Sequence, residues 1–563
     1  MTAFWHFQRA LGLISLIFLA SMTSVSAGGI DEEIDKWMEP IAGALETIVF
    51  FAVPVGGQML PVVLAVLGGT AIFLTIYFRF INLRAFGLAL RTARGKYTNP
   101  DAPGQITHFQ ALTAALSATV GLGNIAGVAV AVGLGGPGAT FWMILMGLCG
   151  MTTKFCECTL GVKYRVIDQN GKAHGGGMYY LARGLAEKGF GPFGAFLGIF
   201  FALMCIGGAL GAGNMFQANQ AYSQFTGTFG GQMFIDHPSL FGAIMAIFVG
   251  LVIIGGIVWI ARVTSFLVPF MCGIYVLTAL VIIFSNLDQV PGAIGMIVTG
   301  AFSPEAVGGG IVGVLIQGIK RAAFSNEAGV GSAPIAHAAV KTDKPASEGL
   351  VALLEPFTDT VVVCTMTALV LVITGVWKVD GIVEADELAL RAEPKVEALQ
   401  VGSVNKDAKL RIISKSDGWG EVWREGEEKT AWIEMEEVTP VEGVAKTSAA
   451  FGEKVAWFPK ILAIAVLLFA FSTMISWSYY GEQAVIFLCG RRIPAVVLVY
   501  KVIFCLFVIV GASASLGNVI RVSDAMIFAM VLPNMIGLYI LLPVVKRELA
   551  SYMKHVQEVD GKK

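Results

Sequence analysis

The sequence predicts an all-α protein that crosses a membrane many times. Of its 563 residues, 56% are hydrophobic and only 14% are charged, and its mean hydropathy is +0.73. Several apolar stretches are longer than the roughly 20 residues with which a helix spans a bilayer. The formal net charge of −1 gives no electrostatic reason to expect a nucleic-acid partner. A polytopic membrane protein is therefore the expected fold class.

The first 27 residues have the composition of a secretory signal peptide. Arg9 precedes an apolar run over residues 11–20, and small residues follow at 25–27. This run is short for a membrane span, so residues 1–27 are expected to be a signal peptide, with an uncleaved anchor as the alternative. Cleavage would leave the mature N-terminus on the outer side of the cytoplasmic membrane.

Eleven apolar runs of about 18 residues or more follow this segment. They lie at residues 58–78, 107–133, 138–162, 193–222, 241–261, 264–285, 306–337, 349–377, 459–488, 494–514 and 523–545. Lys and Arg gather in alternate connections, at 79–96, 163–165, 341–344, 491–492 and 546–547. Because cytoplasmic connections carry the excess of Lys and Arg, this pattern places the N-terminus outside and the tail 546–563 in the cytoplasm. The expected location is the inner membrane of a bacterium.

The composition changes between the eighth and ninth runs. Residues 378–454 hold seventeen of the forty acidic residues and eleven basic residues. Residues 378–455 are therefore expected to form a water-exposed periplasmic insert. This insert divides the membrane transport domain into a first part, 28–377, and a second part, 456–545.

The insert itself is expected to be a small β-meander. Short strands are indicated at 409–414, 420–423 and 430–435, separated by turn-forming residues. Its three tryptophans are expected to form the core of this unit, with a binding face as the alternative. They are Trp419, Trp423 and Trp432.

The sequence contains no recognisable enzyme or cofactor motif. The eight cysteines lie in or at the ends of predicted spans, so no disulfide framework is expected. Cys156 and Cys158 would point in different directions on a helix, which disfavours a metal site. No nucleophile–base pattern, phosphate-binding loop or His-rich helix occurs. A transport protein without a cofactor is therefore expected rather than an enzyme.

The second apolar run is the most informative about function. Gly121, Gly123 and Gly127 favour an interruption of the helix, and Asn124 adds a side-chain carbonyl oxygen. In a bilayer, unwound backbone needs other partners, and a substrate carboxylate or a cation supplies them. Thr119 and Asn124 are polar groups that close helix packing does not require, so an ion and substrate site is favoured over packing alone. A dinucleotide-binding loop, which this glycine spacing imitates, would need a preceding strand.

Two further runs carry polar residues that suit a transport pathway. The fourth run has amides that either face the pathway or bond to neighbouring helices: Asn214, Gln217 and Asn219. The ninth run has hydroxyls that either ligate a small cation or bond to their own helix: Ser472, Thr473 and Ser476. Trp477 lies one turn from Thr473. Together with the polar residues of the second run, these residues indicate a single site for the ion and the substrate.

The seventh run contains Asn326 and Glu327, which are expected to act in gating. An acid at mid-membrane depth is costly unless it is paired, with Lys320 and Arg321 as the candidate partners, or placed in an aqueous vestibule. The alternative is that this segment is a cytoplasmic helix end, with Glu327 an ordinary exposed acid.

Five motifs give the chain a specific resemblance to a known family. They lie at residues 104–127, 134–143, 175–181, 213–219 and 324–333. These segments resemble the alanine or glycine:cation symporter family, typified by bacterial sodium:alanine symporters. The resemblance covers about residues 45–377 and 456–545, and it leaves out the signal-like start and the insert.

The resemblance implies a leucine-transporter-like architecture, in which two inverted repeats of five helices follow one extra N-terminal helix. It also implies a sodium site made by the carbonyls of Ser117, Val120 and Ala470 and the hydroxyl of Thr473. Ser472 is a possible substitute ligand, because Met474 replaces the second hydroxyl of the fold's pattern.

The same resemblance implies a substrate site at the interrupted helix. The substrate carboxylate would meet the N–H groups of Gly121 to Gly123, and Asn124 would be available to a second cation. The other residues expected to shape a small pocket are Phe216, Gln217, Thr473 and Trp477. The ring of Trp477 would exclude large substrates.

The expected function is sodium-coupled symport of a small neutral amino acid, alanine or glycine, into the cell by alternating access. One alternative is a proton-coupled symporter, in which Glu327 would be the first candidate to carry the proton. Another is a nutrient sensor or channel that uses the same binding site. The residues leave D-alanine and serine open as substrates, as well as the number of sodium ions and the oligomeric state.

Overall fold

The computed structural model describes residues 40, 43–55, 58–303, 310–416, 418–423, 430–455, 457–490, 494–514 and 516–561. The predicted signal peptide lies outside these residues. The longer helices are α3 (Val62–Tyr77), α6 (His108–Thr119), α8 (Ala139–Lys163), α11 (Gly191–Leu210), α12 (Phe216–Phe229), α14 (Pro238–Ile253), α15 (Gly256–Ser285), α16 (Val290–Gly300), α17 (Gly310–Asn326), α21 (Thr365–Thr374), α22 (Gly443–Lys454), α23 (Phe458–Cys489), α24 (Pro494–Ser513), α25 (Leu516–Ala529) and α26 (Val531–Gly561).

Short helices connect or extend these elements. They are α4 (Ile81–Arg84), α5 (Phe86–Ala93), α7 (Val128–Gly135), α9 (Gly177–Tyr179), α10 (Leu185–Glu187), α13 (Gln232–Asp236), α18 (Pro334–His337), α19 (Pro345–Ala352) and α20 (Leu354–Pro356). Among the described residues, seven helical segments are long and apolar enough to cross a membrane, or eight if the bent pair around residue 121 is one span. The count of eleven spans stays a prediction.

The outward faces of these helices are apolar, as expected where lipid replaces water. On α15, Phe266, Phe270 and Leu277 are each more than half exposed, while Met271 and Tyr275 are fully buried. A soluble protein rarely exposes such a large apolar surface. The helical body is therefore a membrane domain.

The boundary between the fifth and sixth runs differs from the prediction. It was expected near residues 262–263, but α14 ends at Ile253 and α15 begins at Gly256. Gly256 has a φ of +62°, a left-handed conformation that favours glycine. Arg262 lies within α15 on its exposed side, so its charge did not mark a helix end.

Several helices are distorted in the middle of the bundle. Residues Gly123–Gly127, Gly211–Met215 and Phe357–Cys364 form π-helical turns. The chain is also non-helical between the end of α17 at Asn326 and the start of α18 at Pro334. Such turns often mark functional sites, because they free backbone groups and redirect side chains.

The insert forms a seven-stranded antiparallel sheet with the strand order β11-β5-β8-β9-β10-β6-β7. Its strands are β5 (Gly381–Val383), β6 (Glu387–Arg391), β7 (Gln400–Asn405), β8 (Lys409–Ser416), β9 (Trp419–Trp423), β10 (Ala431–Glu434) and β11 (Val438–Pro440). The three predicted strands correspond to β8, β9 and β10, which pair in sequence order. Two hairpins lie elsewhere, β1–β2 (Ala52–Val55, Gln58–Pro61) and β3–β4 (Val166–Ile167, Ala173–His174).

The expectation that the tryptophans form the core of the insert is wrong. Val422, Ala431 and Ile433 are buried in that core, and the alternation along β9 and β10 turns the tryptophans to the opposite face. Trp423 is 46% exposed, and Trp419 and Trp432 are half-buried. Aliphatic residues fill this core because they occupy the inward positions of the strands.

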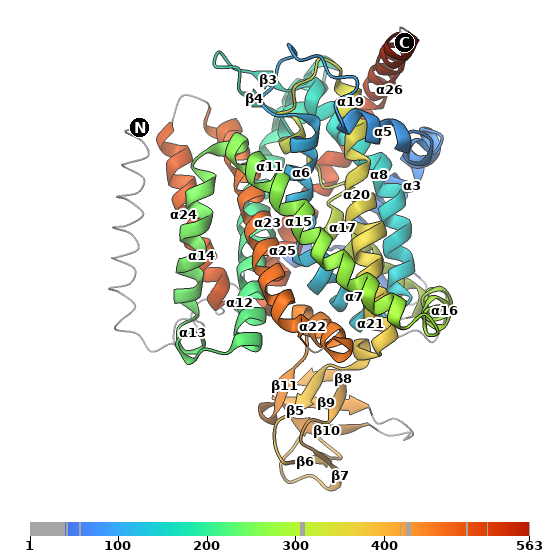
Figure 1. The fold of residues 1–563 in the computed structure, drawn as a ribbon, viewed down its shortest axis with the longest axis vertical. Coiled ribbons are helices and arrows are strands. Elements are labelled where there is room, and N and C mark those ends of the chain that lie inside the picture. Colours follow the sequence, from blue (N-terminus) through green and yellow to red (C-terminus); the bar gives the residue numbers. More distant parts are fainter. Residues whose placement is uncertain are drawn as a thin grey trace.

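The last residues of the predicted insert, α22, pack on the helical body instead. Thr447 Oγ1 donates to the carbonyl of Ile125 over 2.9 Å, and the Val444 N–H donates to Gln220 Oε1 over 3.1 Å. Figure 1 shows the sheet and α22 at one end of the molecule, and α5, α19, the β3–β4 hairpin and the C-terminus at the other. Helix α22 therefore covers the interrupted second span from the insert side.

Candidate functional site

The second predicted span is interrupted where its glycines lie. Helix α6 ends at Thr119, the chain resumes as a helix at Gly123, and the two halves are bent by 50°. Val120 has an extended conformation between them, with a ψ of 91°. The freed N–H of Gly121 donates to Asn124 Oδ1 over 2.8 Å. The amide of Asn124 thus braces the break from within the segment.

The residues of the predicted sodium site bring α6 and α23 together. Thr473 Oγ1 donates to the carbonyl of Ser117 over 3.0 Å, and Ser117 Oγ donates to the carbonyl of Ser472 over 2.6 Å. Val120 and Ala470, whose carbonyls were also predicted, are fully buried. The structure therefore places oxygen atoms of both helices against each other at this position.

Two predicted hydroxyls point elsewhere. Ser472 Oγ donates to the carbonyl of Phe469 over 3.0 Å and lies 3.6 Å from Met271 Sδ. Thr119 Oγ1 donates to the carbonyl of Ala115 over 3.3 Å. Both bond to their own helix, and for Ser472 this was the alternative expected for the hydroxyls of the ninth run. Thr473 is thus the hydroxyl that faces the break.

A buried carboxylate that the sequence interpretation missed lies next to Asn124. Asp359 Oδ1 accepts from Asn124 Nδ2 over 2.6 Å, and Oδ2 accepts from Ser325 Oγ over 2.8 Å and from Thr360 Oγ1 over 2.7 Å. Asn326 Nδ2 in turn donates to Thr360 Oγ1 over 2.8 Å. Three predicted spans, the second, seventh and eighth, therefore meet at one acid.

The surroundings of Asp359 suit a small hard cation. Asp359 is fully buried, and its direct hydrogen-bond partners are an amide and two hydroxyls, which are all neutral. A buried carboxylate at membrane depth is costly without a positive partner. Carboxylate, carbonyl and hydroxyl oxygens are the ligands that such cations prefer. An acid within an apolar run was the signal in the sequence that could have found this residue.

The seventh predicted span is interrupted at the predicted gate residues. Glu327 is only 2% exposed and has a left-handed φ of 55°, which is uncommon outside glycine. Its Oε1 accepts from Trp477 Nε1 over 3.1 Å, and its Oε2 accepts from the Ser332 hydroxyl. The alternative of an exposed helix end is therefore wrong, and so is pairing with Lys320 or Arg321.

The three amides of the fourth predicted span have different roles. Asn214 Nδ2 donates to the carbonyl of Phe504 over 2.6 Å, and Asn219 Nδ2 donates to the carbonyl of Ala514 over 2.7 Å. These two bonds join neighbouring helices. Gln217 Oε1 has no hydrogen-bond partner among the described residues, and it lies 3.5 Å from the position of a β-carbon built on Gly121. Gln217 thus presents an unused acceptor to the break.

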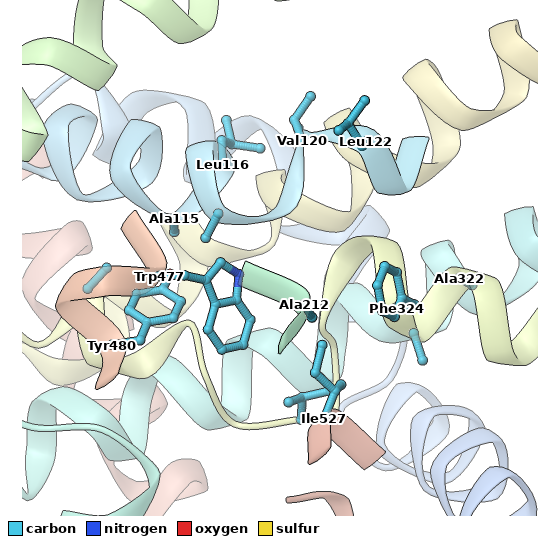
Figure 2. Packing of buried hydrophobic residues seen from close by; sticks show 14 of the residues in the cluster. Ala115, Leu116, Val120, Leu122, Ala212, Ala322, Phe324, Trp477, Tyr480 and Ile527 are labelled. Atoms are coloured by element: carbon cyan, nitrogen blue, oxygen red, sulfur yellow. The ribbon is translucent and has the colours of Figure 1, made fainter. Parts of the chain in front are cut away.

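Trp477 forms one wall beside the break. Its ring contacts Tyr480 at a centroid distance of 5.1 Å, and a β-carbon on Gly213 would lie 2.3 Å from its side chain. Figure 2 shows the indole beside Tyr480, with Leu116 of α6 above it and Ala212 of the fourth span to its right. The bulk of Trp477 therefore fills the space between the second and fourth spans.

An ion pair joins the seventh and last spans on the insert side of the break. Asp524 Oδ2 lies 2.5 Å from Arg321 Nη2 and 2.8 Å from Lys320 Nζ, and Asp524 is 1% exposed. The guanidinium of Arg321 also lies 5.3 Å from the centre of the Phe324 ring, which contacts Phe216 at 5.4 Å. Phe216, a predicted pocket residue, therefore packs against Phe324 of the seventh span, next to this ion pair.

We expect Asp524→Asn to lower amino-acid uptake by about a hundredfold or more. Removing one partner of a buried ion pair costs about 3–5 kcal/mol, because the Arg321 charge is left uncompensated, and about 1.4 kcal/mol corresponds to a factor of ten. Initial uptake rates, corrected for inserted protein, measure the effect. The control is Glu46→Gln, which breaks a partly exposed ion pair with Arg521, a residue of the same helix as Asp524. This variant should change uptake less than about fivefold. Equal losses of uptake in the two variants would contradict the prediction that the buried Arg321–Asp524 pair matters more than the partly exposed pair.

Comparisons with known proteins found a matching family and several relatives. The model of a family described as the sodium:alanine symporter family matches residues 46–400 and 430–563. The chain is 38% identical to the sodium/alanine symporter AgcS of Methanococcus maripaludis, over 87% of this chain and 94% of that protein. It is 30% identical to the amino-acid carrier protein AlsT of Bacillus subtilis, over 87% and 89% of the two chains.

Among solved structures, MhsT in complex with L-phenylalanine matches 79% of this chain and 99% of its own, with a TM-score of 0.44 and 13% identity. Between its two matched ranges the family model leaves residues 401–429 unmatched, and the described part of this range includes strands β8 and β9 of the insert.

Proposed function

The chain belongs to the sodium:alanine symporter family and moves an amino acid together with a cation, and we propose that the amino acid is alanine or glycine and the cation sodium. Its family is one of transporters, so the protein is a membrane transporter. The observation that carries the sodium proposal is the buried Asp359 carboxylate, which meets Asn124 of the interrupted second span.

Two oxygen-rich positions support sodium as the coupling ion. The first is formed by the Ser117 carbonyl and the Thr473 hydroxyl, and the second by Asp359 with Asn124 and Ser325. A cation at the second position would neutralise the acid and compete with the Asn124 amide for its oxygens. Because Asn124 also holds the N–H of Gly121, such a cation would act directly on the break.

The break offers complementary groups to a small zwitterion. The N–H groups of Gly121 to Gly123 suit a carboxylate, since helix N-termini bind anions, and the Gly121 N–H would have to exchange Asn124 Oδ1 for the substrate. The unused Oε1 of Gln217 suits an ammonium group on the other side. Trp477 limits the room for a side chain, which supports alanine or glycine as the substrate.

Sodium is favoured over protons by the contacts of Glu327. Both of its oxygens accept hydrogen bonds, one from Trp477 and one from Ser332. This arrangement suits an ionised carboxylate that positions the indole. In both contacts Glu327 accepts the hydrogen bond, so neither contact requires a proton on its carboxylate.

We propose that the insert faces the periplasm and the opposite end of the molecule the cytoplasm. The basic connections that follow α3, α8 and α18 lie at the end with α5, α19 and the C-terminus (Figure 1). Lys and Arg are enriched on the cytoplasmic side of membrane proteins. Transport would then consist of opening the α22 side, binding sodium and substrate at the breaks, and releasing them at the α19 side.

Uptake of labelled L-alanine into proteoliposomes tests this function. We expect accumulation with an inward sodium gradient, none when potassium replaces sodium, and a loss of uptake in Asn124→Ala and Thr473→Ala variants that insert normally. Competition should weaken along the series alanine, valine and phenylalanine, because Trp477 excludes large side chains. Uptake that is driven by a pH gradient in the absence of sodium would mean that the coupling ion is the proton and not sodium. Binding without any uptake would favour a sensor.

A further inference from the structure

A second buried polar network, at the end opposite the insert, takes no part in the site described above. His337 of α18 bonds to Glu348 of α19 through Nδ1 over 2.5 Å and to Glu355 of α20 through Nε2. Glu348 also bonds to Nδ1 of His108, the first residue of α6, and Glu355 lies 3.1 Å from Lys154 Nζ of α8. The five side chains are at most 3% exposed.

The contacts of His337 determine its protonation. Each of its ring nitrogens faces a carboxylate oxygen, and only the imidazolium form has two N–H donors. With that proton bound, His337 and Lys154 balance Glu348 and Glu355, and His108 can donate as a neutral ring. Without the proton, one ring nitrogen would direct a lone pair at a buried carboxylate, which is unfavourable.

A metal ion fits this cluster less well than a proton. Donor atoms of Cys158, His337 and Glu355 lie within 4.8 Å of one another. However, both His337 nitrogens are engaged by carboxylates, and the Lys154 ammonium occupies Glu355. A metal would have to displace His337 from Glu348 and Lys154 from Glu355. The arrangement therefore suits a bound proton.

The network joins the two interrupted spans where they must separate for release on this side. His108 begins the first half of the second span, and His337 ends the short helix after the break in the seventh span. The backbones are also in contact, since Ile106 and Val340 form a parallel bridge. Arg165 adds donors to the carbonyls of Ala338, Val340, Pro103 and Thr342. Closure at this end thus depends on groups gathered around His337.

We propose that the proton on His337 is a structural part of the inner gate, so that this end of the transporter closes when His337 is protonated and loosens when it is not. The inference rests on the proposed function for the assignment of this end to the cytoplasm. The charged and titratable groups facing His337 are Glu348, Glu355, Lys154 and Cys158, with His108 behind Glu348. A rise in cytoplasmic pH would then favour release of the substrate.

Hydrogen–deuterium exchange of the purified full-length protein in sodium tests this proposal. Exchange is compared at about pH 6 and about pH 10.5, the second well beyond the ordinary histidine range because each ring nitrogen of His337 faces a carboxylate, with labelling times scaled for intrinsic exchange. We expect protection of residues 105–112 and 334–352 to fall by about tenfold or more at the higher pH, because hydrogen bonds to charged groups are lost. Protection of α14 should stay unchanged and serves as the internal reference.

Two variants accompany the wild type. His337→Gln should show low protection of both segments at either pH, and His237→Gln, which changes an exposed histidine, should behave as the wild type. If His337→Gln also loses protection in α14, it is misfolded, and the wild-type comparison decides alone. Wild-type protection that is independent of pH, or that changes equally in α14, would overturn the proposal. Exchange does not depend on uptake, so a failure of transport would leave this result intact.

Discussion

Asp359→Asn is expected to abolish sodium-driven uptake at ordinary sodium concentrations. The substitution keeps the shape of the side chain but removes the negative charge that would hold the cation. Truncating one partner of a buried, hydrogen-bonded charge pair costs about 2–5 kcal/mol, which corresponds to about thirtyfold to a few thousandfold in affinity. The sodium concentration that gives half-maximal uptake of labelled alanine should rise by that factor.

A matched control is Asp288→Asn, which makes the same chemical change in an exposed acid of the α15–α16 connection. It should leave the sodium dependence within about twofold of the wild type. If Asp359→Asn keeps the wild-type sodium dependence while the protein is correctly inserted, Asp359 is not a cation ligand. If uptake stays sodium-dependent but its maximal rate falls, Asp359 acts on the conformational steps instead.

Gly121→Ala is expected to lower uptake about tenfold to a hundredfold. A β-carbon at this position would lie 2.5 Å from Thr473 Oγ1, which is closer than non-bonded atoms approach. Overpacking of this kind costs about 1–3 kcal/mol, and here it displaces the hydroxyl predicted to bind sodium. Uptake at saturating and at limiting sodium separates loss of the ion site from general damage, since the first should be worse at limiting sodium.

Gly127→Ala provides the control within the same interrupted segment. A β-carbon on Gly127 would meet nothing within 4 Å, so the same methyl group should be tolerated. Uptake within about threefold of the wild type is expected. A loss as large as that of Gly121→Ala would mean that the segment needs glycine for flexibility rather than for the close approach of Thr473.

The two largest predicted effects concern residues that differ in how well the sequence identified them. Gly121 and Thr473 were predicted from the glycine pattern, from the hydroxyls of the ninth run and from the family resemblance. Asp359 was not, although it stands as an acid in an apolar run. Its role depends on Asn124, which lies 235 positions earlier in the chain. No local pattern indicates that these two side chains meet.

The same limit explains the errors about Glu327. Lys320 and Arg321 are near it in sequence, but the left-handed backbone at Glu327 turns its side chain to Trp477, 150 positions away. The two cations instead bond to Asp524, which lies 203 positions from Arg321. The tryptophans of the insert were misplaced for a different reason, since their size suggested a core while their register directs them to the other face.

The sequence by itself determined the class of the protein, the interrupted second span, the three strands of the insert and the family. These properties depend on local requirements: apolar side chains must face lipid, and backbone in a bilayer must be bonded unless glycines and polar groups replace the helix. Only the tertiary structure decided the partners of the buried charges, including the Asp359 cluster, the Arg321–Asp524 pair and the network of His337 with Glu348 and Glu355. Their energies come from the pairing of groups far apart in the chain, and that pairing exists only after the helices have packed.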